Sequence, residues 1–267
     1  MKYREIRCKT ALSRSGLAGL DYSLNPYTGC EHSCIYCYAP STIFYRGDDP
    51  WGTFVQAKSN IPIILEKESR KVRKGVVGIS TVTDPYQPLE GKLRLTRSCL
   101  KVLLAKGFPV CVQTKSALVL RDIDLLVEFS VKEVGFTITT LDDQLSAFLE
   151  PGSSPASERL AALRELSSKG IPTWAFIGPM IPGIITEELL TGLLEDLKDA
   201  GVSHVMIDRL RLKPGMWDVL NQKLAAIPEA RELCGKALLD GGRTFNALKE
   251  KAVRLCQEID LACQPNY

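Results

Sequence analysis

The chain has 267 residues, of which 45% are hydrophobic and 24% charged, and this length suits either one α/β barrel or two small domains. No run of about 18 apolar residues occurs and the N-terminus lacks the apolar core of a secretory signal, which predicts a cytoplasmic protein with no membrane contact. The formal net charge of +3 gives no overall attraction to nucleic acid.

Helical and strand patterns alternate along most of the chain. The first strand is expected near residues 22–29. Apolar runs of five to ten residues then alternate with segments that carry apolar residues at helical spacing. Gly107 closes one of these helices, as glycine often does. Helices are predicted over 59–74, 96–107, 117–129, 155–169 and 186–201, and strands over 76–80, 109–115, 133–140, 171–180 and 202–210.

Six strand–helix units of this kind predict a parallel sheet covered by helices. Six units leave a barrel incomplete, so the predicted class is α/β, a partial (β/α)6 TIM-like barrel. We expect a basic N-terminal segment over 1–20, the barrel core over 21–212, and a helical C-terminal extension over 213–267. A full eight-unit barrel and a doubly wound sheet are the alternatives. In all three, ligands bind at the carboxyl ends of the strands.

Nine cysteines and only two histidines are present. An odd number of cysteines in a large chain without a secretion signal favours metal binding or catalysis over disulfides. Cys30, Cys34 and Cys37 form a C-x3-C-x2-C motif in the stretch NPYTGCEHSCIYCYAP, after the first predicted strand. Structural zinc sites and ferredoxin clusters normally use four protein ligands. Three cysteines therefore suggest a [4Fe–4S] cluster with one iron open to a non-protein ligand, with a zinc knuckle as the alternative.

The cysteine motif, with Tyr36 before its last cysteine, resembles that of the radical S-adenosylmethionine (SAM) superfamily. This resemblance implies a partial (β/α)6 barrel, a [4Fe–4S] cluster and SAM as cofactors. It also implies a reaction in which one electron cleaves SAM to a 5′-deoxyadenosyl radical that abstracts hydrogen from a substrate. Further stretches resemble the spore photoproduct lyase-like branch of the superfamily, namely YSLNPYTGCEHSCIYCYA, STVTDPYQPLE, QTKS, FTITT, LEP and GPMIPG.

The same resemblance implies which residues contact SAM. Thr83 and Asp84 match the pair that holds the methionyl ammonium, although Asp-Pro is also a common turn signal. Lys115 matches the residue that pairs with the carboxylate, and a merely solvated lysine is the alternative. Contacts with the rest of SAM are implied for Tyr36, Thr139 and Gly178, for which simple burial, an ordinary strand residue and a β-bulge are the respective alternatives.

One departure from the branch concerns the cysteine that donates hydrogen in spore photoproduct lyase. The matching stretch here, residues 79–82, contains no cysteine, which puts repair of thymine photoproducts by that route in doubt. Cys111 is a weak candidate for a replacement donor, and a buried free cysteine often acts only as a small apolar residue. Tyr86, Gln87 and Glu90 are expected near Asp84, either for substrate contact or for support.

A second cluster is the least supported alternative, because the spacing of Cys234, Cys256 and Cys263 is unlike that of cluster motifs. The expected partners are an electron donor such as flavodoxin or ferredoxin and an unidentified substrate. Basic side chains near the N-terminus and over 67–74 keep nucleic acid open as a partner. The leading hypothesis is a radical SAM enzyme. The alternatives are a photoproduct lyase-like DNA repair enzyme and a non-enzymatic metal- or nucleic-acid-binding module.

Overall fold

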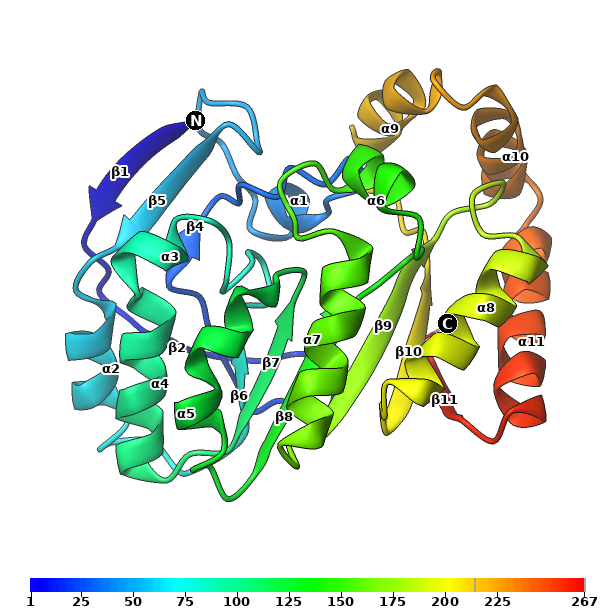
Figure 1. Ribbon diagram of the computed structural model, residues 1–267. Helices are drawn as coiled ribbons and strands as arrows, with labels where there is room; N and C mark the ends of the chain where they lie inside the picture. The colour runs from blue at the N-terminus through cyan, green and yellow to red at the C-terminus, as the bar shows by residue number, and fades with distance from the viewer. Residues whose placement is uncertain (214, 267) are drawn as a thin grey trace.

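The computed structural model describes residues 1–213 and 215–266 and is built around one eight-stranded sheet (Figure 1). Seven of its strands are parallel, and β2 is antiparallel to its neighbour. The strand order is β11-β10-β9-β8-β7-β6-β3-β2. The strands are β2 (Leu12–Arg14), β3 (Tyr22–Leu24), β6 (Val77–Ile79), β7 (Val110–Thr114), β8 (Lys132–Thr137), β9 (Thr173–Met180), β10 (His204–Arg209) and β11 (Ala262–Pro265).

The order of the parallel strands follows the order of the chain and never reverses, which distinguishes this sheet from a doubly wound one. Within the described residues, the two end strands β2 and β11 do not pair with each other, so the sheet is an open barrel. The partial barrel predicted from the alternating pattern is therefore confirmed. Its six expected parallel strands are β3, β6, β7, β8, β9 and β10.

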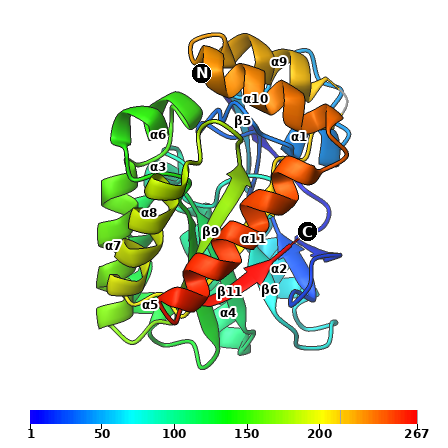
Figure 2. The same cartoon turned by 90° about the vertical axis from the view of Figure 1, so that its right-hand side faces the viewer.

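Helices pack along the sheet much as expected from the apolar spacing (Figures 1 and 2). The predicted helix over 59–74 already ends at Glu68, and the one over 117–129 begins as a 3-10 helix, Ala117–Asp122, whose N-cap is Ser116. The main helices are α2 (Ile61–Glu68), α4 (Leu95–Lys106), α5 (Ile123–Leu126), α7 (Ala156–Ser168) and α8 (Glu187–Asp199). The short helices are α1 (Ala39–Thr42), α3 (Glu90–Leu93) and α6 (Asp143–Leu149).

The central strands have one buried face and one partly open face. Along β7, Val110, Val112 and Thr114 are buried, whereas Cys111 and Gln113 between them are half-buried. The buried side chains join a core cluster that includes Leu100 and Leu103 of α4 and runs through the whole barrel. Removal of this apolar surface from water is the main term that stabilises the fold.

The two ends of the chain differ from expectation. Residues 1–20 supply β2 and also β1 (Lys2–Ile6), which pairs in parallel with β5 (Phe54–Lys58); β5 in turn pairs with β4 (Tyr27–Thr28). The C-terminal extension contains the expected helices α9 (Met216–Leu224), α10 (Pro228–Leu239) and α11 (Arg243–Glu258). It then returns to the sheet as β11, a strand that the sequence did not predict.

Among the described residues, no helix is both long and apolar enough to cross a membrane.

Candidate functional site

The three motif cysteines lie in the segment between β4 and α1, which we call the cysteine loop (residues 30–37). Cys30 is buried, Cys34 and Cys37 are half-buried, and the Cys37 N–H donates to the carbonyl oxygen of Cys34 at 3.1 Å. Burial, followed by the charge of Asp84, raises the pKa of Cys30 to about 12. The thiols also raise one another's pKa, so they lie close together. Within residues 1–213 and 215–266, no three His, Cys, Asp or Glu side chains converge tightly enough to hold a single metal ion.

The first half of the cysteine loop is fixed by its own side chains. Glu31 Oε1 accepts from the Leu89 N–H at 2.6 Å, and Oε2 accepts from the Tyr3 hydroxyl at 2.7 Å. The Glu31 N–H donates to Oε1 of the buried Gln87, and the Ser33 hydroxyl donates to the carbonyl oxygen of Gly52 at 2.8 Å. Glu31 and Ser33, the two neighbours of His32, are therefore both hydrogen-bonded to other parts of the fold.

Residues 149–152, at the end of α6 and just after it, contact both halves of the cysteine loop. The Ile35 N–H donates to the Leu149 carbonyl oxygen at 3.0 Å, and the Gly152 N–H donates to the His32 carbonyl oxygen at 3.1 Å. A Cβ atom at Gly152 would lie 2.1 Å from the Glu31 carbonyl oxygen, so only glycine permits this close approach. These contacts place the LEP stretch, which the sequence singled out without a role, directly against the cysteine loop.

Asp84, expected to hold an ammonium group, is buried and already bonded within the protein. Its Oδ1 accepts from the Tyr86 N–H at 2.9 Å and the Thr114 hydroxyl at 2.7 Å, while Oδ2 accepts from the Lys115 N–H at 2.8 Å and lies 3.3 Å from His32 Nδ1. Burial alone would raise the pKa of Asp84, but His32, Thr114 and Tyr86 together lower it to about 2. Asp84 thus joins the β6 end, the β7 end and the cysteine loop.

Thr83, the predicted companion of Asp84, also contacts the motif. Its hydroxyl donates to the Gly29 carbonyl oxygen at 2.6 Å and accepts from the Gln87 amide at 3.2 Å. The structure therefore brings Thr83 and Asp84 to the cysteine loop, although both side chains have protein partners there.

Lys115 lies beside the same loop, at the end of β7. Its Nζ is 5.9 Å from the centroid of the Tyr36 ring. Burial alone would lower the pKa of Lys115, but the negative charges of Cys34 and Glu150 outweigh it and raise this pKa. An ammonium on a half-buried side chain at the end of a strand is suited to bind an anionic group, and the role of Lys115 stays a prediction.

Six buried side-chain nitrogen and oxygen atoms lack a hydrogen-bond partner in the part of the chain that the structure describes, and His32 Nε2, Ser80 Oγ and Thr139 Oγ1 are three of them. Ser80 follows β6 directly, and Thr139 lies two residues past β8, so both hydroxyls are at carboxyl ends of parallel strands. A buried polar group without a partner is costly. Unused hydroxyls at these strand ends fit a polar cofactor bound across the end of the sheet. Thr139 was predicted, whereas Ser80 and His32 were not.

The remaining predicted residues lie differently. Gly178 is inside β9, where an added Cβ would lie 2.3 Å from the Phe176 ring. The packing of this ring against the backbone is therefore a structural reason for glycine at this position. Cys111 is the second residue of β7, beside Trp174 and Glu133 and three residues before the strand's carboxyl end. The roles of Gly178 and Cys111 stay predictions.

Tyr86 and Glu90, left open between substrate contact and support, form a buried polar network. The Tyr86 hydroxyl donates to Asp122 at 3.1 Å. Glu90, with no exposed surface, accepts from Arg121 at 2.7 Å and from the Tyr27 hydroxyl. This arrangement favours the supporting role.

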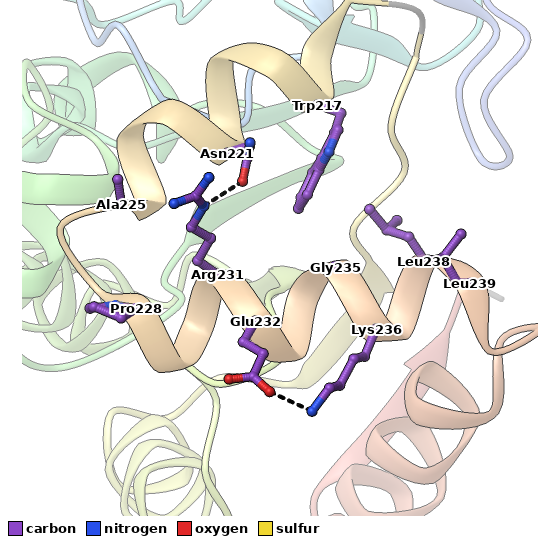
Figure 3. Close-up of a pocket in the computed structure, with 10 residues that line it drawn as sticks. All are labelled: Trp217, Asn221, Ala225, Pro228, Arg231, Glu232, Gly235, Lys236, Leu238 and Leu239. Atoms are coloured by element: carbon purple, nitrogen blue, oxygen red, sulfur yellow. Dashed lines mark hydrogen bonds and ion pairs between the residues drawn. The ribbon is translucent and has the colours of Figure 1, made fainter.

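The C-terminal extension carries a surface groove between α9 and α10 (Figure 3). Arg231 donates to Asn221 at its side, and Leu239 at its end is almost fully exposed. The groove is lined by Trp217, Asn221, Ala225, Pro228, Arg231, Glu232, Gly235, Lys236, Leu238 and Leu239.

Of the cysteines that suggested a second cluster, Cys256 on α11 and Cys263 on β11 lie together.

Comparison with known proteins assigns the class. The model of the radical SAM superfamily matches residues 24–191, which include the cysteine loop and the four parallel strands β6, β7, β8 and β9. An uncharacterised protein of Methanocaldococcus jannaschii is 37% identical over 188 residues, covering 70% of this chain and 71% of its own length. A protein of Pseudomonas phage M6 named radical SAM Nalpha-GlyT isomerase is 28% identical over 184 residues, covering 68% of this chain and 38% of its own length.

Solved structures show the same fold. A spore photoproduct lyase variant with bound AdoMet (SAM) and dinucleoside spore photoproduct superposes with a TM-score of 0.68 at 16% identity, covering 98% of this chain and 81% of that one. The fold and the cysteine loop are those of a SAM-dependent iron–sulfur enzyme. The chain belongs to the radical SAM superfamily. Its cofactors are accordingly a [4Fe–4S] cluster and SAM.

Proposed function

We propose that Cys30, Cys34 and Cys37 ligate three irons of the [4Fe–4S] cluster and that SAM binds beside them. The cluster, when bound and reduced, supplies the electron that cleaves SAM to a 5′-deoxyadenosyl radical. The observation that carries this proposal is the fixed cysteine loop, in which the residues between the thiols are bonded to several separate segments.

The residues around the loop would bind and orient SAM. Lys115, a half-buried lysine, provides a positive charge for the carboxylate. Ser80 and Thr139 provide hydroxyls without a protein partner among the described residues, just past the carboxyl ends of β6 and β8. Thr83 and Asp84 support the loop through Gly29 and His32, and Asp84 accepts an ammonium only if one of its present donors moves aside.

The substrate is proposed to lie on the partly open face of the sheet. Gln113, next to the last residue of β7, and Phe176, in the middle of β9, are half-buried on that face. An electron donor such as flavodoxin or ferredoxin would reduce the cluster.

A nucleoside-containing substrate is the second proposal. It is supported by the dinucleoside spore photoproduct bound to the structural neighbour. The absence of cysteine from residues 79–82 speaks against hydrogen return by the lyase route.

The test is anaerobic reconstitution with iron and sulfide, followed by dithionite and SAM. We expect a [4Fe–4S] absorption and EPR spectrum and release of 5′-deoxyadenosine. Cys30→Ala, Cys34→Ala and Cys37→Ala should each abolish both, while Cys8→Ala, at a half-buried cysteine next to β1, should keep both. A cluster that survives in a motif variant would overturn the assignment. Deuterium transfer into 5′-deoxyadenosine from labelled nucleosides, oligonucleotides or peptides would then identify the substrate class.

A further inference from the structure

Glu150, in the LEP stretch, has no exposed surface, and each of its two carboxylate oxygens accepts a hydrogen bond. One carboxylate oxygen accepts from the Tyr36 hydroxyl, and the other accepts from the guanidinium of Arg159. Tyr36 lies between Cys34 and Cys37, so the carboxylate reaches into the part of the loop that separates two thiols.

Arg159 is itself fully buried, in the first turn of α7. Its Nε donates to the Ser154 carbonyl oxygen at 2.7 Å, and Nη1 donates to the Thr137 carbonyl oxygen at 2.9 Å as well as to Glu150. Nη2 donates to the hydroxyls of Ser146 and Ser153. All five guanidinium N–H groups therefore have acceptors, which is the condition under which a buried ion pair is held in one geometry.

The chain around Glu150 is equally fixed. Its N–H donates to the Ser146 carbonyl oxygen at 2.8 Å, and its own carbonyl oxygen accepts from the Ser153 hydroxyl at 2.8 Å. The carboxylate is thus immobile, and the Tyr36 phenol that donates to it is fixed as well. The Tyr36 ring in turn lies beneath the ammonium of Lys115, close enough for a cation–π interaction.

We propose that Glu150, held by Arg159, is a positioning residue that sets the orientation of Tyr36. Through Tyr36 it also sets the conformation of residues 34–37 of the cysteine loop and the position of Lys115. The proposal rests on the assignment of the cluster to the cysteine loop. It gives the LEP stretch a role in shaping the cofactor site without contact with the reacting atoms.

The test compares Tyr36→Phe and Glu150→Gln with Tyr38→Phe. Tyr38 is the matched control, because it stands on the other side of Cys37 and its hydroxyl donates instead to the Thr81 carbonyl oxygen at 3.1 Å. The first readout is hydrogen exchange of the peptide 30–38 in the protein without cofactors. Tyr36→Phe and Glu150→Gln should each raise the exchange rate of this peptide about tenfold, because a hydrogen bond to a buried charge contributes enough to account for a factor of ten. Tyr38→Phe should leave the rate unchanged.

The second readout is a SAM titration followed by the EPR spectrum of the reduced cluster. Each of the two variants should weaken SAM binding about tenfold, and the double variant should be no worse than Glu150→Gln alone, since the Tyr36 hydroxyl acts through Glu150. Equal exchange rates in wild type and the two variants, or additive effects on SAM binding, would overturn the role of Glu150. Failure of the wild type to form a cluster would instead overturn the proposed function.

Discussion

The Asp84 carboxylate and the His32 imidazole face each other inside the protein, with 3.3 Å between Oδ2 and Nδ1. His32 is part of the cysteine loop, and Asp84 follows the end of β6. The other hydrogen bonds of Asp84 come from Thr114 and Lys115 at the end of β7, and from the N–H of Tyr86, two residues after Asp84. A residue predicted to bind a ligand is therefore also the point at which the loop is fastened to the sheet.

Replacement of Asp84 by Asn should destabilise the protein. In either amide orientation the NH2 group faces a backbone N–H, of Lys115 or of Tyr86, so one buried donor loses its acceptor. We expect the free energy of unfolding to fall by about 1–3 kcal/mol, measured by urea denaturation. Asp21→Asn is the control, since Asp21 accepts the Val76 N–H near the surface and can keep that bond. Unchanged stability with weakened SAM binding would show that Asp84 serves the ligand alone.

Gly152→Ala should displace the segment that packs on the cysteine loop. The new methyl group would lie 2.1 Å from a backbone oxygen, which cannot rotate away. We expect a loss of about 1–3 kcal/mol in unfolding free energy and a lower iron content after reconstitution. Gly192→Ala in α8 has open space around it and should stabilise the protein slightly. Wild-type iron content in the Gly152 variant would contradict the tight packing.

Lys115→Met keeps the length of the side chain and removes its charge. If the ammonium binds the SAM carboxylate, SAM binding should weaken by about tenfold to a hundredfold, while the cluster still forms. The control is Lys58→Met, at a lysine whose Nζ donates to the Asn25 carbonyl oxygen. The measurement is SAM titration by EPR, and equal affinities in wild type and Lys115→Met would refute the predicted role.

Glu90→Gln should affect stability and spare chemistry. Glu90 is fully buried and accepts from Arg121, Tyr27 and the Thr96 N–H, so the amide would leave part of this network unsatisfied. We expect unfolding free energy to fall by about 1–3 kcal/mol. SAM cleavage per folded molecule should stay at the wild-type rate. Glu66→Gln, at a partly exposed ion pair with Arg70, should cost less than about 1 kcal/mol. A slower reaction in folded Glu90→Gln would move Glu90 into the substrate site.

The sequence predicted the barrel because short apolar strands and amphipathic helices alternate locally, and periodicity over ten residues is enough to detect them. It did not predict β11, whose four residues pair with β10 across three intervening helices. The cysteine loop was predicted from residue type and spacing. The supports of that loop were not, because the bonds of Glu31 and Tyr36 to distant segments are tertiary contacts with no local pattern.

The predicted ligand residues show the same division. Spacing and resemblance placed Thr83, Asp84 and Lys115 near the motif, and the structure brings all three there. Whether a carboxylate is free or already bonded depends on which backbone N–H groups surround it. For Asp84 those groups belong to residues two and 31 positions further along the chain.

The distance of 114 residues between Tyr36 and Glu150 along the chain also affects how the protein is made. During synthesis the three motif thiols leave the ribosome early, whereas the acid and the arginine that shape their loop emerge far later. Glu31 and Ser33 have their partners within the first 89 residues, whereas Tyr36 lacks its partner until Glu150 has been added and Arg159 holds it in place. The cysteine loop therefore gains its last support only when a segment more than a hundred residues away has been synthesised and packed.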